Sequence, residues 1–463
     1  MEKREVEVDY GNEKMLVSVP NSSMIPRGTN PQGLPDPRSA VQQALENPIG
    51  IKRISELAKS GDKVMIAFDH HKMHIPRTII LPLVFEELNK AGISKKDITL
   101  VSSPGACPKS TRSELREEVG GQIYDEFWPS RLRPHDAAGP DELVYLGESK
   151  YGDIVEPNRL VKDCDILIYL GAIRVGSWGG YSGSGAVVGL GSARSISSHH
   201  SYGVMMHKDS IPSDPRKMLY KKHKTAVQMK IEEATGKQIF YVDSVYNRNG
   251  ELVRVFAGHY PEIAEPEWKF ADELYIVDVP RQADIMIIGL PRHVWYGNTN
   301  NVINALTVVD TPARLWINKP MLKEGGVIVV TAKVSDNIDR VAHPNYDEIM
   351  KLWDKSLTAE DLIDREEEYF HRSDLLAKYK FGYAFHPAHP FWLFYADQYI
   401  LNHAGKIIFA GVEDPAPVRR LGCTPTRDFK EAWRLATQIV GNDPETLVLP
   451  DWHTGINFRM RVN

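Results

Sequence analysis

The amino-acid sequence predicts an α/β fold of two domains, each with a largely parallel sheet flanked by helices, and an active site in the cleft between them. Three observations lead to this expectation. Short apolar segments alternate with amphipathic ones, which is typical of parallel sheets covered by helices. The 463 residues suffice for two or three domains. Chemically unusual segments follow three predicted strands, and open α/β sheets bind ligands beyond the carboxyl ends of their strands.

The first domain contains three clear strand predictions and two helix starts. Pro76 is expected to begin a helix with an apolar stripe, because proline suits the first helical turn. Thr111, followed three residues later by Glu114, predicts a helix with a capping box over residues 111–118. The predicted strands are Lys63–Phe68, Ile98–Ser103 and Asp165–Ala172.

A second series of apolar segments predicts the second domain. A charged stretch between Pro266 and Pro280 separates the two series, so we place the first domain at residues 1–272 and the second at 273–463. The predicted strands of this series are Ala283–Leu290, Gly326–Ala332, Lys406–Gly411 and Thr446–Leu449.

Composition excludes several classes of protein. The formal charge of -5 argues against a nucleic-acid binder. No apolar run reaches the ~18 residues of a membrane helix, and the polar start does not resemble a secretory signal. The chain contains three cysteines whose spacing fits no zinc motif. Their low, odd number favours a cytoplasmic protein.

Two of the unusual segments follow the first two strands. Asp69–Pro76 carries His70, His71 and His74, which could bind a metal, move protons or hold an anion, or could form a solvated loop. Ser102–Thr111 combines small residues with a helix start, a combination that lets an anion approach the backbone. Within it, Cys107 is a nucleophile, a soft metal ligand or inert packing.

The third segment, Gly171–Gly191, is rich in glycine and follows the third strand. A flexible linker has a similar composition. Because the run also contains Trp178 and Tyr181, a loop that cradles a phosphate or cofactor explains it better. It matches no standard nucleotide fingerprint. His199 and His200 come next and suit metal binding, although either could be structural.

In this order, these segments resemble the nickel-dependent lactate racemase-like family of 2-hydroxyacid racemases and epimerases. Asp69-His70 resembles the opening of the family's D-H-T-R-P-x-P loop, with Lys72 at its arginine. Tyr181-Ser182-Gly183 resembles F-S-G, and His200 falls on the nickel-ligating histidine. Trp392 falls at an active-site tryptophan. Further matches are Ala44–Gly50, Phe256–Gly258, Glu324–Gly326 and Leu449–Asp451.

The chain also departs from the family pattern at positions that carry chemistry. Cys107 and Gly176 stand where the family has its two catalytic histidines. Ser184 stands in the loop that holds the cofactor-tethering lysine, and Ile303–Thr307 replaces a substrate-contacting motif. The resemblance therefore implies a nickel-pincer nucleotide that is held non-covalently.

We expect an isomerase that inverts C2 of a 2-hydroxyacid, either lactate-like or larger, such as a sugar acid, by reversible hydride transfer to this cofactor. Its partners are the hydroxyacid and the cofactor-biosynthesis enzymes, with no nucleic acid and no membrane. Two alternatives are a non-catalytic relative that binds a nucleotide or hydroxyacid, and an unrelated metal-dependent enzyme using His70–His74.

Each candidate site residue has one expected role. We expect catalytic groups at His71, His74 and Cys107, a metal ligand at His200, and substrate contacts at Arg174 and Trp392. The expected cofactor-binding residues are Asp69, His70, Lys72, Gly180, Tyr181, Ser182, Gly183 and Ser184.

Overall fold

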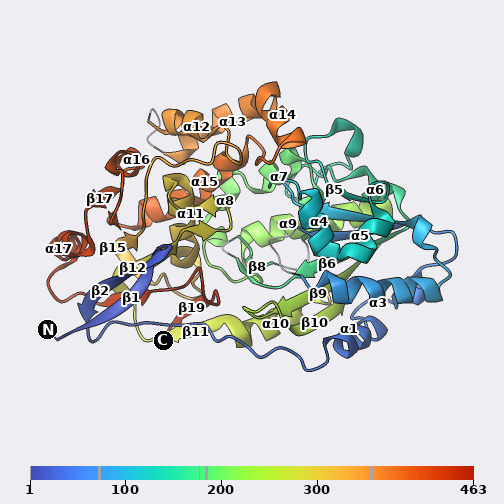
Figure 1. Ribbon diagram of the computed structural model, residues 1–463, viewed down its shortest axis with the longest axis horizontal. Helices are drawn as coiled ribbons and strands as arrows, with labels where there is room; N and C mark the ends of the chain where they lie inside the picture. The colour runs from blue at the N-terminus through green and yellow to red at the C-terminus, as the bar shows by residue number, and fades with distance from the viewer. Residues whose placement is uncertain (1, 71–74, 177, 183–185, 355–357) are drawn as a thin grey trace.

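The computed structural model contains two large β-sheets that are flanked by helices (Figure 1). It describes residues 2–70, 75–176, 178–182, 186–354 and 358–463. The first sheet has the order β10-β9-β6-β3-β4-β5 and is parallel except for the β9/β10 pair. Its strands are β3 (Val64–Asp69), β4 (Ile98–Ser103), β5 (Leu132–Pro134), β6 (Ile166–Ala172), β9 (Ile239–Tyr246) and β10 (Leu252–Gly258).

The second sheet has the order β17-β16-β15-β12-β1-β2, with β18 also paired to β12, and only the β1/β2 pair is antiparallel. Its strands are β1 (Lys3–Gly11), β2 (Glu13–Pro20), β12 (Ala283–Pro291), β15 (Leu322–Thr331), β16 (Lys406–Ala410), β17 (Thr424–Thr426) and β18 (Thr446–Leu449). The strand predictions of both series are therefore confirmed.

Three short strand pairs complete the sheets: β7 (Val175–Gly176) with β8 (Gly180–Tyr181), β13 (His293–Val294) with β14 (Gly297–Asn298), and β11 (Ile276–Val279) with β19 (Arg459–Val462). The helices are α1 (Pro37–Glu46), α2 (Ile54–Leu57), α3 (Arg77–Lys90), α4 (Arg112–Val119), α5 (Gly121–Phe127), α6 (Arg159–Asp163), α7 (Ala193–His199), α8 (Tyr202–Met205), α9 (Leu219–Thr235), α10 (Ala264–Tyr275), α11 (Val302–Arg314), α12 (Tyr346–Trp353), α13 (Ile363–Phe370), α14 (Ser373–Phe381), α15 (His389–His403), α16 (Pro415–Arg420) and α17 (Phe429–Val440).

Two local predictions have informative outcomes. The predicted capping box is present: Thr111 caps α4, and its side chain accepts the backbone N–H of Glu114. The charged stretch around Pro266 is a helix, α10, rather than a linker. Pro266 is tolerated because it lies in the first turn, where the N–H that proline lacks has no intrahelical partner.

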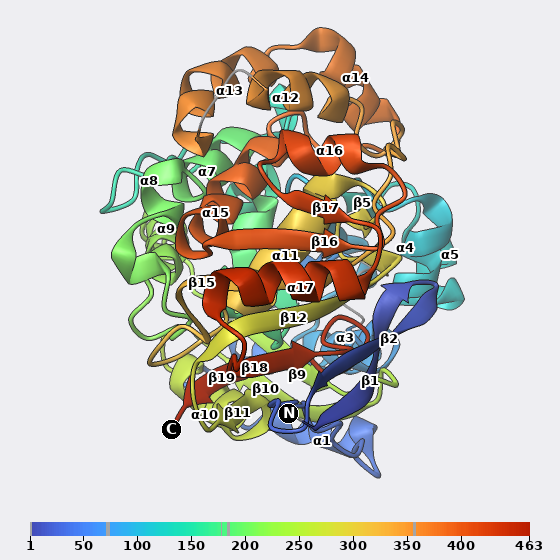
Figure 2. The same ribbon diagram turned by 90° about the vertical axis from the view of Figure 1, so that its left-hand side faces the viewer.

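Strand alternation assigns the two faces of each sheet. In β3, Ile66 and Phe68 pack in the apolar cluster formed with α1 and α3, whereas Met65 and Ala67 join a cluster that continues into the second domain. In the second sheet, α17 covers the outer face (Figure 2). Helices α9, α11 and α15 contribute to the shared cluster and lie between the two sheets.

The N-terminal hairpin does not follow the expected domain boundary. We expected residues 1–272 to form the first domain, yet Tyr10 of β1 pairs with Leu290 of β12 in the second sheet. This pairing joins segments that are far apart in the chain, so no local sequence pattern predicts it.

Candidate functional site

The carboxyl ends of three neighbouring strands are linked by one tyrosine. Tyr169 of β6 donates its hydroxyl to Asp69 Oδ1 of β3 at 2.6 Å and lies 3.0 Å from Ser103 Oγ of β4. Burial raises the pKa of Asp69, against the opposing effect of this hydrogen bond. Asp69 Oδ2 has no hydrogen-bond partner within the described residues. The three predicted loops therefore begin at one edge of the first sheet, as expected.

His200 follows α7 and has a defined tautomer. Its Nδ1 lies 2.9 Å from the carbonyl oxygen of Ile196, to which only a protonated nitrogen can donate. Nε2 therefore carries the lone pair and accepts the hydroxyl of Tyr220 at 2.7 Å. Burial, and to a smaller extent the charge of Lys224, lower the pKa of His200 to about 3. The imidazole is neutral, which is the form that binds metals.

Aromatic rings surround this imidazole. The centroids of Tyr220, Trp178 and Trp392 lie 5.1, 5.3 and 5.5 Å from that of His200. Trp392 lies in the first turn of α15 in the second domain, and its Nε1 donates to Glu366 Oε1 at 3.0 Å. The structure thus brings together two residues, His200 and Trp392, that the sequence placed in one site.

The β13–β14 hairpin of the second domain faces the same loops. The ring centroid of Trp295 lies 4.3 Å from the guanidinium of Arg174 and 5.2 Å from the ring of His70. Tyr296 lies 6.2 Å from Trp178, between ring centroids. The candidate site is therefore located where the two domains meet, with Arg174 and His70 at its border.

The loop that carries Cys107 also packs against the second domain. His386 N donates to the carbonyl oxygen of Ala106 at 2.9 Å, and the hydroxyl of Tyr379 donates to that of Gly105 at 3.1 Å. Cys107 is half-buried, and a negative charge on it would act together with burial to raise the pKa of Tyr296. Cys107 is therefore close to the hairpin tyrosine.

Three expected cofactor-binding residues have structural partners instead. Tyr181 donates its hydroxyl to Asp272 Oδ1 at 2.8 Å, and the guanidinium of Arg459 lies 4.6 Å from its ring centre. Ser182 Oγ donates to the carbonyl oxygen of Ala172 at 2.7 Å. A Cβ on Gly180 would lie 2.4 Å from the carbonyl oxygen of Ser213, so glycine is needed there for close backbone packing.

Tyr181 lies in β8, which pairs with β7, and its side chain contacts Asp272 of α10 and Arg459 of β19. The remaining predicted site residues, His71, Lys72, His74, Gly183 and Ser184, lie outside the described residues.

Sequence reasoning missed Lys221 and Lys224, which lie on α9. Lys221 is close to the glycine-rich segment, because its Cδ would lie 3.7 Å from a Cβ on Gly179. Burial lowers the pKa of Lys221 to about 7 and that of Lys224 to about 8. A usable signal existed: with Gln228 and Ile231 these lysines continue one helical stripe, and Ile231 is in the core. Polar residues on an apolar stripe mark a place where burial serves something other than packing.

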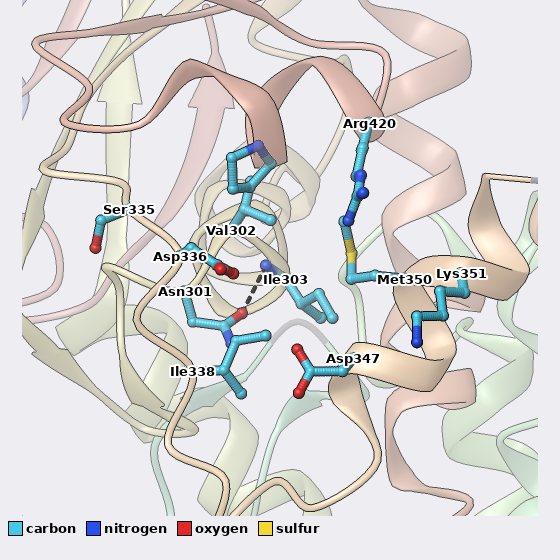
Figure 3. Close-up of a pocket in the computed structure, with 11 residues that line it drawn as sticks. Asn301, Val302, Ile303, Ser335, Asp336, Ile338, Asp347, Met350, Lys351 and Arg420 are labelled. Carbon is cyan, nitrogen blue, oxygen red and sulfur yellow. Dashed lines mark hydrogen bonds between the residues drawn. The ribbon is translucent and has the colours of Figure 1, made fainter.

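A separate pocket of about 260 Å³ lies in the second domain, near the start of α11 (Figure 3). Its walls mix two cations, Lys351 and Arg420, with two carboxylates, Asp336 and Asp347. Asp347 is paired with Arg340 at 2.7 Å. None of the predicted site residues that the structure describes lines this pocket, so it is distinct from the site around His200.

Residues 10–211 match the profile of a family described as the lactate racemase N-terminal domain. A lactate racemase of Thermoanaerobacterium thermosaccharolyticum is 22% identical over 467 residues, which cover 96% of this chain and 97% of that protein. A lactate racemase of Lactiplantibacillus plantarum is 24% identical over 311 residues, 65% of this chain and 66% of that protein.

Solved structures share the fold. The lactate racemase apoprotein of T. thermosaccharolyticum superimposes with a TM-score of 0.74 at 22% identity, covering 99% of this chain and 100% of that one. A Thermotoga maritima protein gives 0.58 at 13% identity, covering 93% and 100%. None of the helices that the structure describes is both long and apolar enough to cross a membrane.

Proposed function

We propose that this chain is an isomerase of the lactate racemase-like family and that it inverts C2 of a 2-hydroxyacid with a nickel-pincer nucleotide bound at His200. The observation that carries the proposal is the state of His200. Its Nδ1 is fixed by Ile196, and the carbonyl partner typical of metal-binding histidines orients Nε2 as a ligand.

The donor set also fits a metal that brings ligands of its own. Within the described ranges, no three His, Cys, Asp or Glu side chains gather to hold a metal ion. A nickel atom at His200 would therefore take most of its ligands from the nucleotide, as a pincer provides. When bound, this cofactor would accept the C2 hydride of the substrate and return it to either face of the resulting keto acid.

The residues of the chain would then bind, orient and move protons. Tyr220 would give up its hydrogen bond to His200 Nε2 when the metal binds. Trp178 and Trp392 would exclude water from the metal side. Arg174, half-buried beside Trp295, would hold the substrate carboxylate. The hydroxyl proton needs a base, for which we propose His71 and His74, with Cys107 as the group on the opposite loop.

Two observations favour a substrate larger than lactate, such as a sugar acid. A Cβ on Gly176 would meet no atom of the described residues within 4 Å, which leaves open space beside this position. In α11, Asn304 uses its side-chain amide to hold the hairpin, donating to the carbonyl oxygens of Tyr296 at 3.2 Å and Asn298 at 3.3 Å. It supports Tyr296 rather than offering a free contact to a small acid.

The proposal is tested with protein made alongside the enzymes that build the cofactor. Elemental analysis and mass spectrometry should find nickel and a pyridinium nucleotide. Denaturation should release the nucleotide and leave the chain mass unmodified, because no lysine stands in the Tyr181–Gly191 loop. Chiral chromatography should then show inversion of lactate or of an aldonic acid.

The other outcomes identify the alternatives. Ligand binding without inversion by the nickel-loaded protein would indicate a non-catalytic relative. Zinc or iron without a nucleotide would indicate a metal enzyme that uses His70–His74. A nucleotide adduct on Ser184 or any lysine would overturn non-covalent binding.

A further inference from the structure

Among the described residues, no counter-charge is in direct contact with the amino group of Lys224. Lys224 is half-buried on α9 and makes no hydrogen bond or ion pair with any described residue. The nearest aromatic group is the ring of Tyr220, whose centre lies 5.7 Å from Nζ. A lysine that gives up part of its hydration without an ion pair reduces the stability of the folded chain.

His199 is a second polar group without a partner in the same place. It is fully buried, and within the part of the chain that the structure describes neither ring nitrogen has a hydrogen-bond partner. An imidazole always carries at least one N–H group, and burying that donor without an acceptor costs about 1–3 kcal/mol.

Among the described residues, no acid offsets the charge of Lys224 by direct contact. Asp69 interacts electrostatically with Lys224, but burial raises the pKa of Asp69, and the two side chains form no ion pair. Asp243 and Glu267 act on Lys221 instead, raising its pKa against burial. Lys221 in turn repels Lys224, one turn further along the helix. An ammonium group and an N–H donor thus remain for a ligand with acceptor oxygens.

We propose that Lys224 and His199 form an oxyanion-binding site on the inner face of α9. The ligand class is a phosphate or a carboxylate. The proposed function supplies both sources, the phosphate of the nucleotide and the carboxylate of the hydroxyacid, and only the identity of the anion rests on that function. Nζ of Lys224 lies 5.7 Å from the ring centre of Tyr220, whose hydroxyl contacts His200 Nε2, so the anion would bind near the metal position.

The test uses cofactor-free protein and compares Lys224→Met with Lys222→Met, an exposed lysine of the same helix. The probes are inorganic phosphate, nicotinic acid mononucleotide, its phosphate-free nucleoside, and lactate, measured by calorimetry and thermal shift. Lys224→Met should weaken binding of at least one anion roughly 10- to 100-fold, and Lys222→Met should leave it unchanged. Loss for mononucleotide and phosphate identifies the phosphate, and loss for lactate identifies the carboxylate.

Stability provides a second readout. Without ligand, Lys224→Met should melt at a temperature equal to or above that of the unsubstituted protein, because a desolvated charge is removed. Equal anion affinity in both variants, or no anion binding by the unsubstituted protein, would overturn the site. So would a large loss of stability in Lys224→Met, which would make Lys224 structural. None of these measurements depends on inversion, so failure of the racemase assay leaves the anion site standing.

Discussion

The two ends of helix α9 bury polar groups in opposite ways. Near its C-terminus, Glu232 Oε2 lies 3.0 Å from His259 Nε2, while His259 Nδ1 lies 3.1 Å from Glu262. Both ring nitrogens have partners, and these carboxylates raise the pKa of His259 against the effect of burial. Near the N-terminus, Lys224 and the neighbouring His199 of α7 have no such partners among the described residues, and burial lowers the pKa of both.

The difference separates structure from function on one helix. Polar groups that are buried with partners can hold the fold together, whereas polar groups buried without them weaken it unless a ligand completes them. The His259 end therefore belongs to the scaffold, and the His199–His200 end belongs to the site. Substitutions at the two ends should have different consequences.

The largest effect is expected from His200→Ala. Removing the only proposed protein nitrogen on nickel should abolish nickel retention and inversion together, because even partners beyond the metal ligands are each worth 10- to 100-fold in affinity. Elemental analysis after gel filtration measures the retained nickel. Full nickel occupancy in this variant would place the ligand elsewhere, with His199 as the first alternative.

The next largest effect is expected in the loop after β3. His71→Asn and His74→Asn should lower turnover roughly 10²- to 10⁴-fold while nickel stays bound, because histidine is the side chain best suited to carry the hydroxyl proton near neutral pH. Rates from chiral chromatography, set beside nickel content, measure both. Full turnover in both variants would reject the assignment and direct attention to the His386–His389 segment.

A smaller effect, on stability, compares the two ends directly. His259→Leu removes one partner of a buried ion pair and should lower the free energy of unfolding by about 3 kcal/mol. His199→Leu removes an unsatisfied group and should change it little or raise it. Urea unfolding measures the free energy of unfolding of the two variants. An equal decrease in both would show that the two ends of the helix do not differ in this way.

The contributions of His259 and His199 to the free energy of unfolding should depend on pH with opposite signs. The folded pKa of His259 is raised, so its contribution is complete below the unfolded pKa of about 6.5 and is lost as the pH rises through the raised value. The folded pKa of His199 is lowered, so the protein with His199 loses stability as the pH falls below about 6.5. Unfolding curves at several pH values test both signs.

The sequence predicted local features well because local features have local causes. The strand after Asp165 and the Thr111 capping box follow from adjacent residues alone. The place of Tyr181 could not be predicted, because it depends on Asp272 and Arg459 from distant elements. Lys224 could have been noticed because it continues the helical stripe of Ile231, but its lack of an ion-pair partner among the described residues is visible only in the packed structure.

The most direct test of the account follows deuterium at C2 of one enantiomer of a 2-hydroxyacid, lactate or an aldonic acid, incubated with nickel-loaded protein in ordinary water. If this site moves a hydride away and returns it, the opposite configuration should form with deuterium still at C2, as mass spectrometry of the separated product would show. Inversion with deuterium lost to water, or no inversion of either acid, would contradict the proposed function.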